Sequence, residues 1–140
     1  MEHRIKMQKS IQGTIHNITD SQKLQQLMRD FCSAKRFAYK RFREGKELND
    51  VRKLTKIEYS PLNSRYICDA VNEGEAIYTI FKDQKIIFGS KKLWNKLLNN
   101  KISNQHNKQK RDDEIYSRGS KDKKGNLNTR IYLENSQLKL

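Results

Sequence analysis

The sequence predicts an α+β fold in which a block of helices separates one early strand from several later β segments. Three observations predict this order. Apolar residues alternate with polar ones near the start, recur at helical spacing through the middle, and are followed by short β-type segments next to glycines. With 140 residues, the chain is long enough for one compact domain, or for two small lobes that share a core.

The first strand is predicted over residues 4–16, because its apolar residues share parity and would face one side of a sheet. These residues are Ile5, Met7, Ile11 and Ile15. A capping box formed by Thr19 and Gln22 then predicts the start of a helix that runs to Glu44. Gly45 stands just past its last turn, where a glycine ends a helix well.

Two further helices are predicted after this one. The shorter covers residues 47–57, and the longer runs from Pro61 to about Lys82. Ser60 is the expected N-cap of the longer helix, with proline at its first helical position. Gly74 falls inside that helix and costs about 1 kcal/mol relative to alanine, so it predicts a close approach to another helix.

The C-terminal part is predicted to return to β structure. A short strand is expected over residues 85–89, then a brief helix over residues 90–98 and a polar, charged stretch over residues 99–114. Residues 115–119 and 129–133 are β-type segments on either side of a loop with a Gly-Asn pair, which tolerates positive φ. They are predicted to pair as a hairpin.

The charge of the chain favours a polyanionic partner. It carries 30 Lys and Arg against 16 Asp and Glu, a formal net charge of +14, and its pI is about 9.9. That pI exceeds the value of about 9 that is typical of nucleic-acid-binding domains. Nucleic acid is therefore the expected partner.

Several classes of protein are excluded by the sequence. It has no apolar run of membrane-spanning length, and its first residues lack the apolar segment of a secretory signal. Cys32 and Cys68 are far apart, without CxxC spacing, so neither a disulfide framework nor a zinc site is expected. Both are expected to be buried in a reducing compartment. We therefore expect a cytoplasmic protein with no membrane contact, no metal and no cofactor.

The longest predicted helix carries one basic stripe. Arg29, Arg36, Lys40 and Arg43 recur at steps of seven, four and three, and Lys35 and Arg41 widen the stripe. A solvated helix face is the alternative interpretation. Phosphate binding is favoured because acidic partners four residues away are scarce, so the charges are not neutralised within the helix.

Two more basic clusters and one aromatic residue complete the candidate site. Bases of a single strand stack on aromatic rings, and Tyr39 lies between two arginines of the stripe. For the two later clusters, a flexible basic loop is an equal alternative. The candidate nucleic-acid-binding residues are Arg29, Lys35, Arg36, Tyr39, Lys40, Arg41, Arg43, Lys91, Lys92, Arg118, Lys121, Lys123 and Lys124.

No catalytic arrangement is evident, and an enzyme is not expected. The three histidines lie in separate segments. The acidic run Asp112-Asp113-Glu114 could hold Mg²⁺ with a substrate phosphate, but it is better explained as a solvated patch that balances Lys108, Lys110 and Arg111. The sequence contains neither a nucleophile elbow nor a dinucleotide fingerprint.

Four segments together resemble one known family. They read FCSAKRFAYKRF at 31–42, LNSRYICDAV at 62–71, IFGSKKL at 87–93, and SRGSK with KGN at 117–126. Their order resembles the N-terminal part of the OrfB/TnpB transposon proteins, which are RNA-guided DNA nucleases related to type V CRISPR effectors.

The resemblance implies a division of the chain and roles for its parts. Residues 1–17 and 85–140 would form a wedge element, a small β-barrel of oligonucleotide-binding type. Residues 18–84 would be an inserted recognition bundle of about three helices. In that family these parts grip the guide RNA and its target. The basic residues that match the family segment are Lys35, Arg36, Lys40 and Arg41.

The RuvC-like nuclease domain of that family has no counterpart among these residues. We therefore expect a non-catalytic module that binds guide RNA or DNA and is truncated before the nuclease. One alternative is one half of a split RNA-guided endonuclease, with a separate RuvC-domain polypeptide as partner. Another is a small regulator that places a helix in the major groove of DNA.

Overall fold

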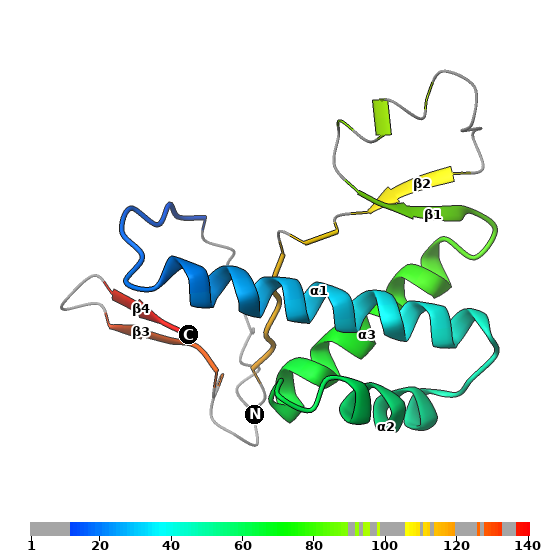
Figure 1. Cartoon of the computed structure of the whole chain (residues 1–140), viewed down its shortest axis with the longest axis horizontal. Coiled ribbons are helices and arrows are strands. Elements are labelled where there is room, and N and C mark those ends of the chain that lie inside the picture. The colour runs from blue at the N-terminus through cyan, green and yellow to red at the C-terminus, as the bar shows by residue number, and fades with distance from the viewer. Residues whose placement is uncertain are drawn as a thin grey trace, which may run out of the picture.

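The computed structural model confirms the α+β class. Among the residues that the structure describes, helices α1 to α3 are followed by four short strands, which pair as two separate two-stranded sheets (Figure 1). Among the described residues these sheets do not close into a barrel. The structure describes residues 12–89, 106–109, 111–112, 114–119, 126, 128–132 and 137–140, together with positions 92, 94, 95 and 98.

Helix α1 (Ser21–Arg43) is the longest element. Its N-cap is Asp20, whose side chain accepts a hydrogen bond from the Lys23 backbone N–H at 3.0 Å. The predicted N-cap Thr19 is therefore wrong by one residue, because a carboxylate at the positive end of the helix dipole caps better than a hydroxyl. The predicted stop is confirmed, since Gly45 adopts φ +85°.

Helices α2 (Leu48–Glu58) and α3 (Ser64–Ile80) form the rest of the helical block. Helix α3 begins three residues later than predicted. Pro61 lies in a turn that the Leu62 N–H closes onto the Tyr59 carbonyl at 2.9 Å. Asn63 then caps the helix by accepting from the Tyr66 N–H at 3.0 Å, so Ser60 is not the N-cap.

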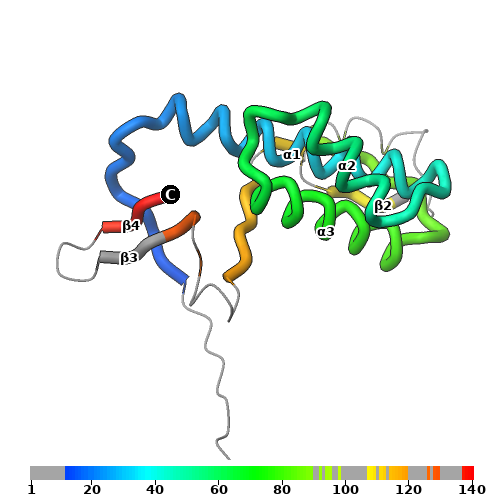
Figure 2. The backbone as a smooth tube through the Cα atoms, turned by 90° about the horizontal axis from the view of Figure 1, so that it is seen from below, coloured from blue at the N-terminus to red at the C-terminus, as the bar shows by residue number. Residues whose placement is uncertain are grey.

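The core lies mainly between α1 and α3. Fully buried side chains of α1, such as Phe31 and Ala38, pack against Ala70 and Val71 of α3. A Cβ built on Gly74 would lie 2.9 Å from the Lys35 carbonyl oxygen of α1. This confirms the predicted close approach. Figure 2 shows α2 running alongside the crossed pair.

Strands β1 (Lys85–Phe88) and β2 (His106–Gln109) pair in parallel. The predicted strand at residues 85–89 is confirmed, whereas β2 falls in the stretch predicted to be only polar and charged. The Phe88 ring meets the Tyr39 ring edge-on at 5.5 Å, which places this sheet against the C-terminal half of α1. Positions 92, 94 and 95 are helical, in agreement with the brief predicted helix.

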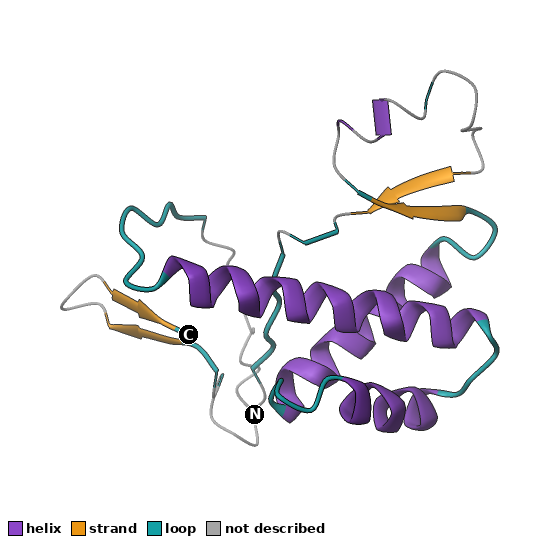
Figure 3. Ribbon diagram, viewed as in Figure 1, coloured by secondary structure: helices purple, strands orange, loops and turns teal. Residues whose placement is uncertain are grey.

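The predicted C-terminal hairpin has a different partner strand. Strand β3 (Arg130–Tyr132) pairs antiparallel with β4 (Gln137–Lys139). Residues 115–119 are not in a strand, because side chains of α3 bind their backbone groups: Asp69 accepts from the Arg118 N–H at 3.0 Å. This sheet lies near the N-terminal end of α1, opposite the β1–β2 pair (Figure 3).

The predicted N-terminal strand is wrong where it can be compared. Residues 12–16 are exposed and belong to no strand, and the rest of that prediction lies outside the described residues. No partner strand from the described part of the chain reaches this segment. Among the described helices, none is long and apolar enough to cross a membrane.

Candidate nucleic-acid interface

Four basic residues lie on the side of α1 that faces away from the core. We call them the α1 basic face: Arg29, Arg36, Lys40 and Arg43. Arg29, Lys40 and Arg43 are exposed, and Arg36 is partly buried. Arg29 donates to the Gln26 Oε1 at 3.1 Å, and the Arg43 guanidinium lies 6.0 Å from the Tyr39 ring centroid. Helical spacing thus brings together the stripe that the sequence predicted.

A later segment contacts this face at Arg36, its partly buried member. The crossing segment, residues 111–112 and 114–119, runs from β2 over α1 to α3 (Figure 1). Arg36 donates to the Asp112 Oδ1 at 3.2 Å, to the Arg111 carbonyl, and to the Ser33 Oγ at 3.1 Å. A carboxylate 76 residues further along the chain therefore neutralises part of the stripe.

Lys35 lies inside the protein. Only 2% of its side chain is exposed, and its Nζ forms an ion pair with the Glu114 Oε2 at 3.2 Å. Beside it, the Cys32 thiol donates to the Glu114 carbonyl at 3.1 Å. Burial raises the pKa of the Cys32 thiol, which keeps it protonated and a poor nucleophile. Lys35 therefore anchors the crossing segment and is withdrawn from the surface.

Tyr39 is also withdrawn, with 5% of its surface exposed behind Phe88. Burial raises the pKa of its hydroxyl. Arg41 is turned to another side of α1, where it pairs with the Glu44 Oε1 at 3.1 Å and lies 4.9 Å from the Phe37 ring centroid. Neither residue therefore joins the α1 basic face.

The two later clusters are only partly described. Lys92 is exposed at a helical position. The Arg118 side chain is exposed, while its backbone is fixed by the Asp69 carboxylate and by Arg65, which donates to the Arg118 carbonyl at 3.2 Å. The remaining candidates lie outside the described residues: Lys91, Lys121, Lys123 and Lys124.

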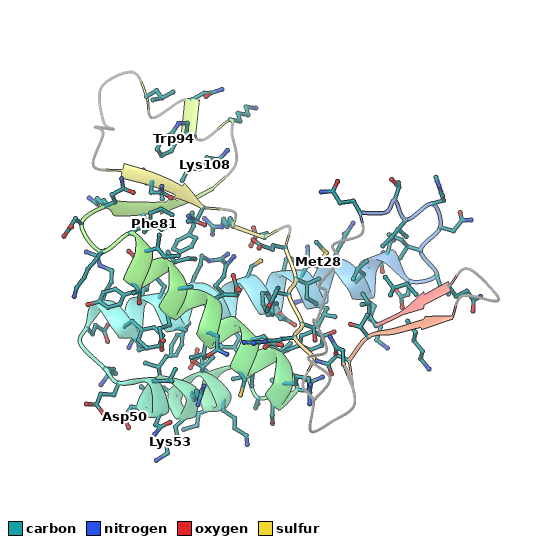
Figure 4. The ribbon with its side chains drawn as sticks, turned by 180° about the vertical axis from the view of Figure 1, so that it is seen from behind. Met28, Asp50, Lys53, Phe81, Trp94 and Lys108 are labelled. Atoms are coloured by element: carbon teal, nitrogen blue, oxygen red, sulfur yellow. The ribbon has the colours of Figure 1, made fainter. Side chains whose placement is uncertain are left out.

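A second basic surface was missed by the sequence analysis of the site. Register pairs Lys108 with Ile87, so both lie on the sheet face opposite the one that Phe88 presents to α1. Lys85 shares this outer face by strand alternation. Figure 4 shows Lys108 with Trp94 on the side of the sheet remote from α3. The sequence of β2 has no alternation of apolar and polar residues that would predict a strand. In β1, Lys85 and Ile87 are two residues apart, and this spacing alone predicts that Lys85 lies on the same face of the strand as Ile87.

The acidic run has a different role from the predicted one. Glu114 and Asp112 neutralise Lys35 and Arg36 of α1. Of the predicted partners, Arg111 lies beside Asp112, with its Nε 3.6 Å from the Asp112 Oδ2, and Lys110 lies outside the described residues. Within the residues that the structure covers, no group of three His, Cys, Asp or Glu is placed to hold a metal ion. Of the two free cysteines, Cys32 is buried as expected, but Cys68 is exposed on α3.

The fold and its surface define a small, basic α+β domain with one charged helix face. A family model described as the SSO2105 N-terminal domain matches residues 10–140, so the chain belongs to that family. Neither the curated proteins nor the solved structures gave a match. The family description names a domain and no activity.

Proposed function

We propose that this chain is a non-catalytic nucleic-acid-binding module that contacts phosphates through the α1 basic face. The observation that carries the proposal is the row of exposed cations Arg29, Lys40 and Arg43 on one side of a single rigid helix. At 1.5 Å per residue the row spans about 21 Å. That length corresponds to about six phosphates of one strand at 3.4 Å each.

The proposed partner is guide RNA or DNA, as the resemblance to the OrfB/TnpB proteins implies. The finer fold is part of the same proposal: residues 1–17 and 85–140 as a wedge-like β element around a helical insert at residues 18–84. Two features support it, since helices α1, α2 and α3 fall within the insert and strands β1 to β4 fall within residues 85–140. DNA cleavage would fall to a separate RuvC-domain polypeptide, and the complex would act in the cytoplasm.

The experiment compares two variants that lose the same charge in different places. Lys40→Gln with Arg43→Gln removes two cations from the α1 basic face. The control, Lys53→Gln with Lys56→Gln, removes two exposed cations from α2. Figure 4 shows Lys53 on the side of the molecule away from the β1–β2 sheet. Binding of a fluorescent single-stranded RNA and a DNA duplex is measured at one salt concentration.

The α1 variant should bind about tenfold more weakly than the wild-type chain, because two phosphate contacts are lost. The α2 variant should change much less. An equal loss in both variants would mean that the net charge alone attracts nucleic acid, and the proposed interface would then be rejected. Thermal unfolding of both variants checks that the fold is intact.

A further inference from the structure

Asp112 occupies the position on the α1 basic face where a phosphate would meet Arg36. Arg36 stands between Arg29 and Lys40, seven residues after one and four before the other. Its guanidinium already donates hydrogen bonds to the Asp112 carboxylate at 3.2 Å, to the Arg111 carbonyl and to the Ser33 hydroxyl. A planar guanidinium takes phosphate oxygens in the same forked geometry that it uses for a carboxylate.

The Asp112 contact is the exposed end of a segment that is otherwise held inside the protein. The Asp112 side chain is 41% exposed and Arg36 is 19% exposed. An ion pair in this position is screened by water and contributes little. Two residues further on, Glu114 of the same segment is bound to Lys35, which is 2% exposed, and to the Cys32 thiol.

Further along, the Arg118 N–H is bound by the buried Asp69 carboxylate at 3.0 Å. Asp112 can therefore leave Arg36 by a local movement while the rest of the crossing segment stays in place. The segment thus has a firm anchor at Glu114 and Arg118 and a weakly held carboxylate at Asp112.

We propose that Asp112 is an internal competitor of phosphate at Arg36, which lowers the affinity of the α1 basic face for nucleic acid. This inference rests on the proposed function. A strand held by Arg29 and Lys40 presents a phosphate to Arg36 at a high local concentration, which a free phosphate ion does not. The competition therefore favours a continuous strand over isolated anions.

The first test is Asp112→Asn, which removes the charge and keeps the shape. The control is Asp50→Asn on α2, an exposed position with the same change in net charge, which Figure 4 shows beside Lys53 and away from the β1–β2 sheet. Affinity is measured for a short single-stranded RNA of mixed sequence. Asp112→Asn should bind about two- to fivefold more tightly than Asp50→Asn.

The second test repeats Asp112→Asn in an Arg36→Gln background. If Asp112 acts by occupying Arg36, its removal should then improve binding no more than Asp50→Asn does. An equal gain in both backgrounds, or no gain over Asp50→Asn in either, would overturn the inference while leaving the proposed function standing. Failure of the wild-type chain and of Asp112→Asn alike to bind RNA or duplex would overturn both proposals.

Discussion

Glu73 lies on α3 among other charged groups that the crossing segment and α1 bring together. Its pKa is raised from the ordinary value of 4.5, first because it is partly buried, and next because the Glu114 carboxylate repels its charged form. Lys35 lowers the pKa in part, and Asp69 raises it further. The native state therefore binds this proton more tightly than the unfolded chain does.

The sign of the resulting pH dependence follows from linkage. Glu73 adds stability below its unfolded pKa, near 4.5, and that contribution is lost as the pH rises through the higher folded pKa. Glu73→Gln should remove this loss, so the variant should gain free energy of unfolding relative to the wild-type chain at neutral pH and little below pH 4.5. Chemical denaturation at both pH values measures the difference. The same change at Glu75, on another face of α3, is the control, and an equal gain there would contradict the prediction.

For the residues of the candidate site, the sequence could predict which of them share a face of the helix, but not which of them would be buried. Helical periodicity is local, so it placed Arg29, Lys40 and Arg43 together. It could not show that Lys35 would be buried, because Glu114, the partner that makes its burial tolerable, lies 79 residues away. Asp112 is predicted to be a solvated charge for a similar reason, since its partner Arg36 lies 76 residues earlier in the chain.

At the scale of elements, the crossing of α1 and α3 depends on the absence of a side chain at Gly74. An added Cβ would lie 2.9 Å from the Lys35 carbonyl oxygen and 3.0 Å from the Tyr39 backbone nitrogen. Both are helix backbone atoms, so one helix must shift to make room. Overpacking of this kind costs about 1–3 kcal/mol, which exceeds the gain of about 1 kcal/mol in helix propensity.

Gly74→Ala should therefore lower the free energy of unfolding by up to about 2 kcal/mol. Urea denaturation monitored by circular dichroism measures this loss. Gly13→Ala serves as the control, since a Cβ there would meet nothing within 4 Å. A stabilised Gly74→Ala variant would show that the helices separate at little cost, and the close crossing would lose its importance.

The helices could be predicted better than the strands because their signals are contained within each segment. Apolar spacing and glycine stops act over a few residues, so α1, α2 and α3 could be predicted with errors of one to three residues at their ends. Strand β2 reads His-Asn-Lys-Gln and has no apolar alternation of its own. Its pairing with β1 depends on a partner some 20 residues earlier in the chain, which local patterns do not report.

At the scale of the whole molecule, the net charge of +14 is a poor guide to the number of cations that α1 offers to a nucleic acid. Lys35 and Arg36 are neutralised by the crossing segment, and Arg41 is paired with Glu44. The exposed cations of the α1 basic face are then Arg29, Lys40 and Arg43. Each phosphate that is neutralised releases counterions, which makes the affinity depend on salt.

The share of α1 in this salt dependence can be measured by substituting all three exposed cations with glutamine. Plots of log affinity against log salt should become shallower by about 2 for a single strand and about 3 for a duplex. The matched control replaces Lys53, Lys56 and Lys82, three exposed cations outside α1 and outside the β1–β2 sheet, and should leave the slope unchanged. A flattening in the control as large as that in the α1 variant would mean that nucleic acid has no fixed footprint on this protein. A slope that changes only in the α1 variant would place the phosphates along this helix, because only charges in contact with phosphate displace its counterions.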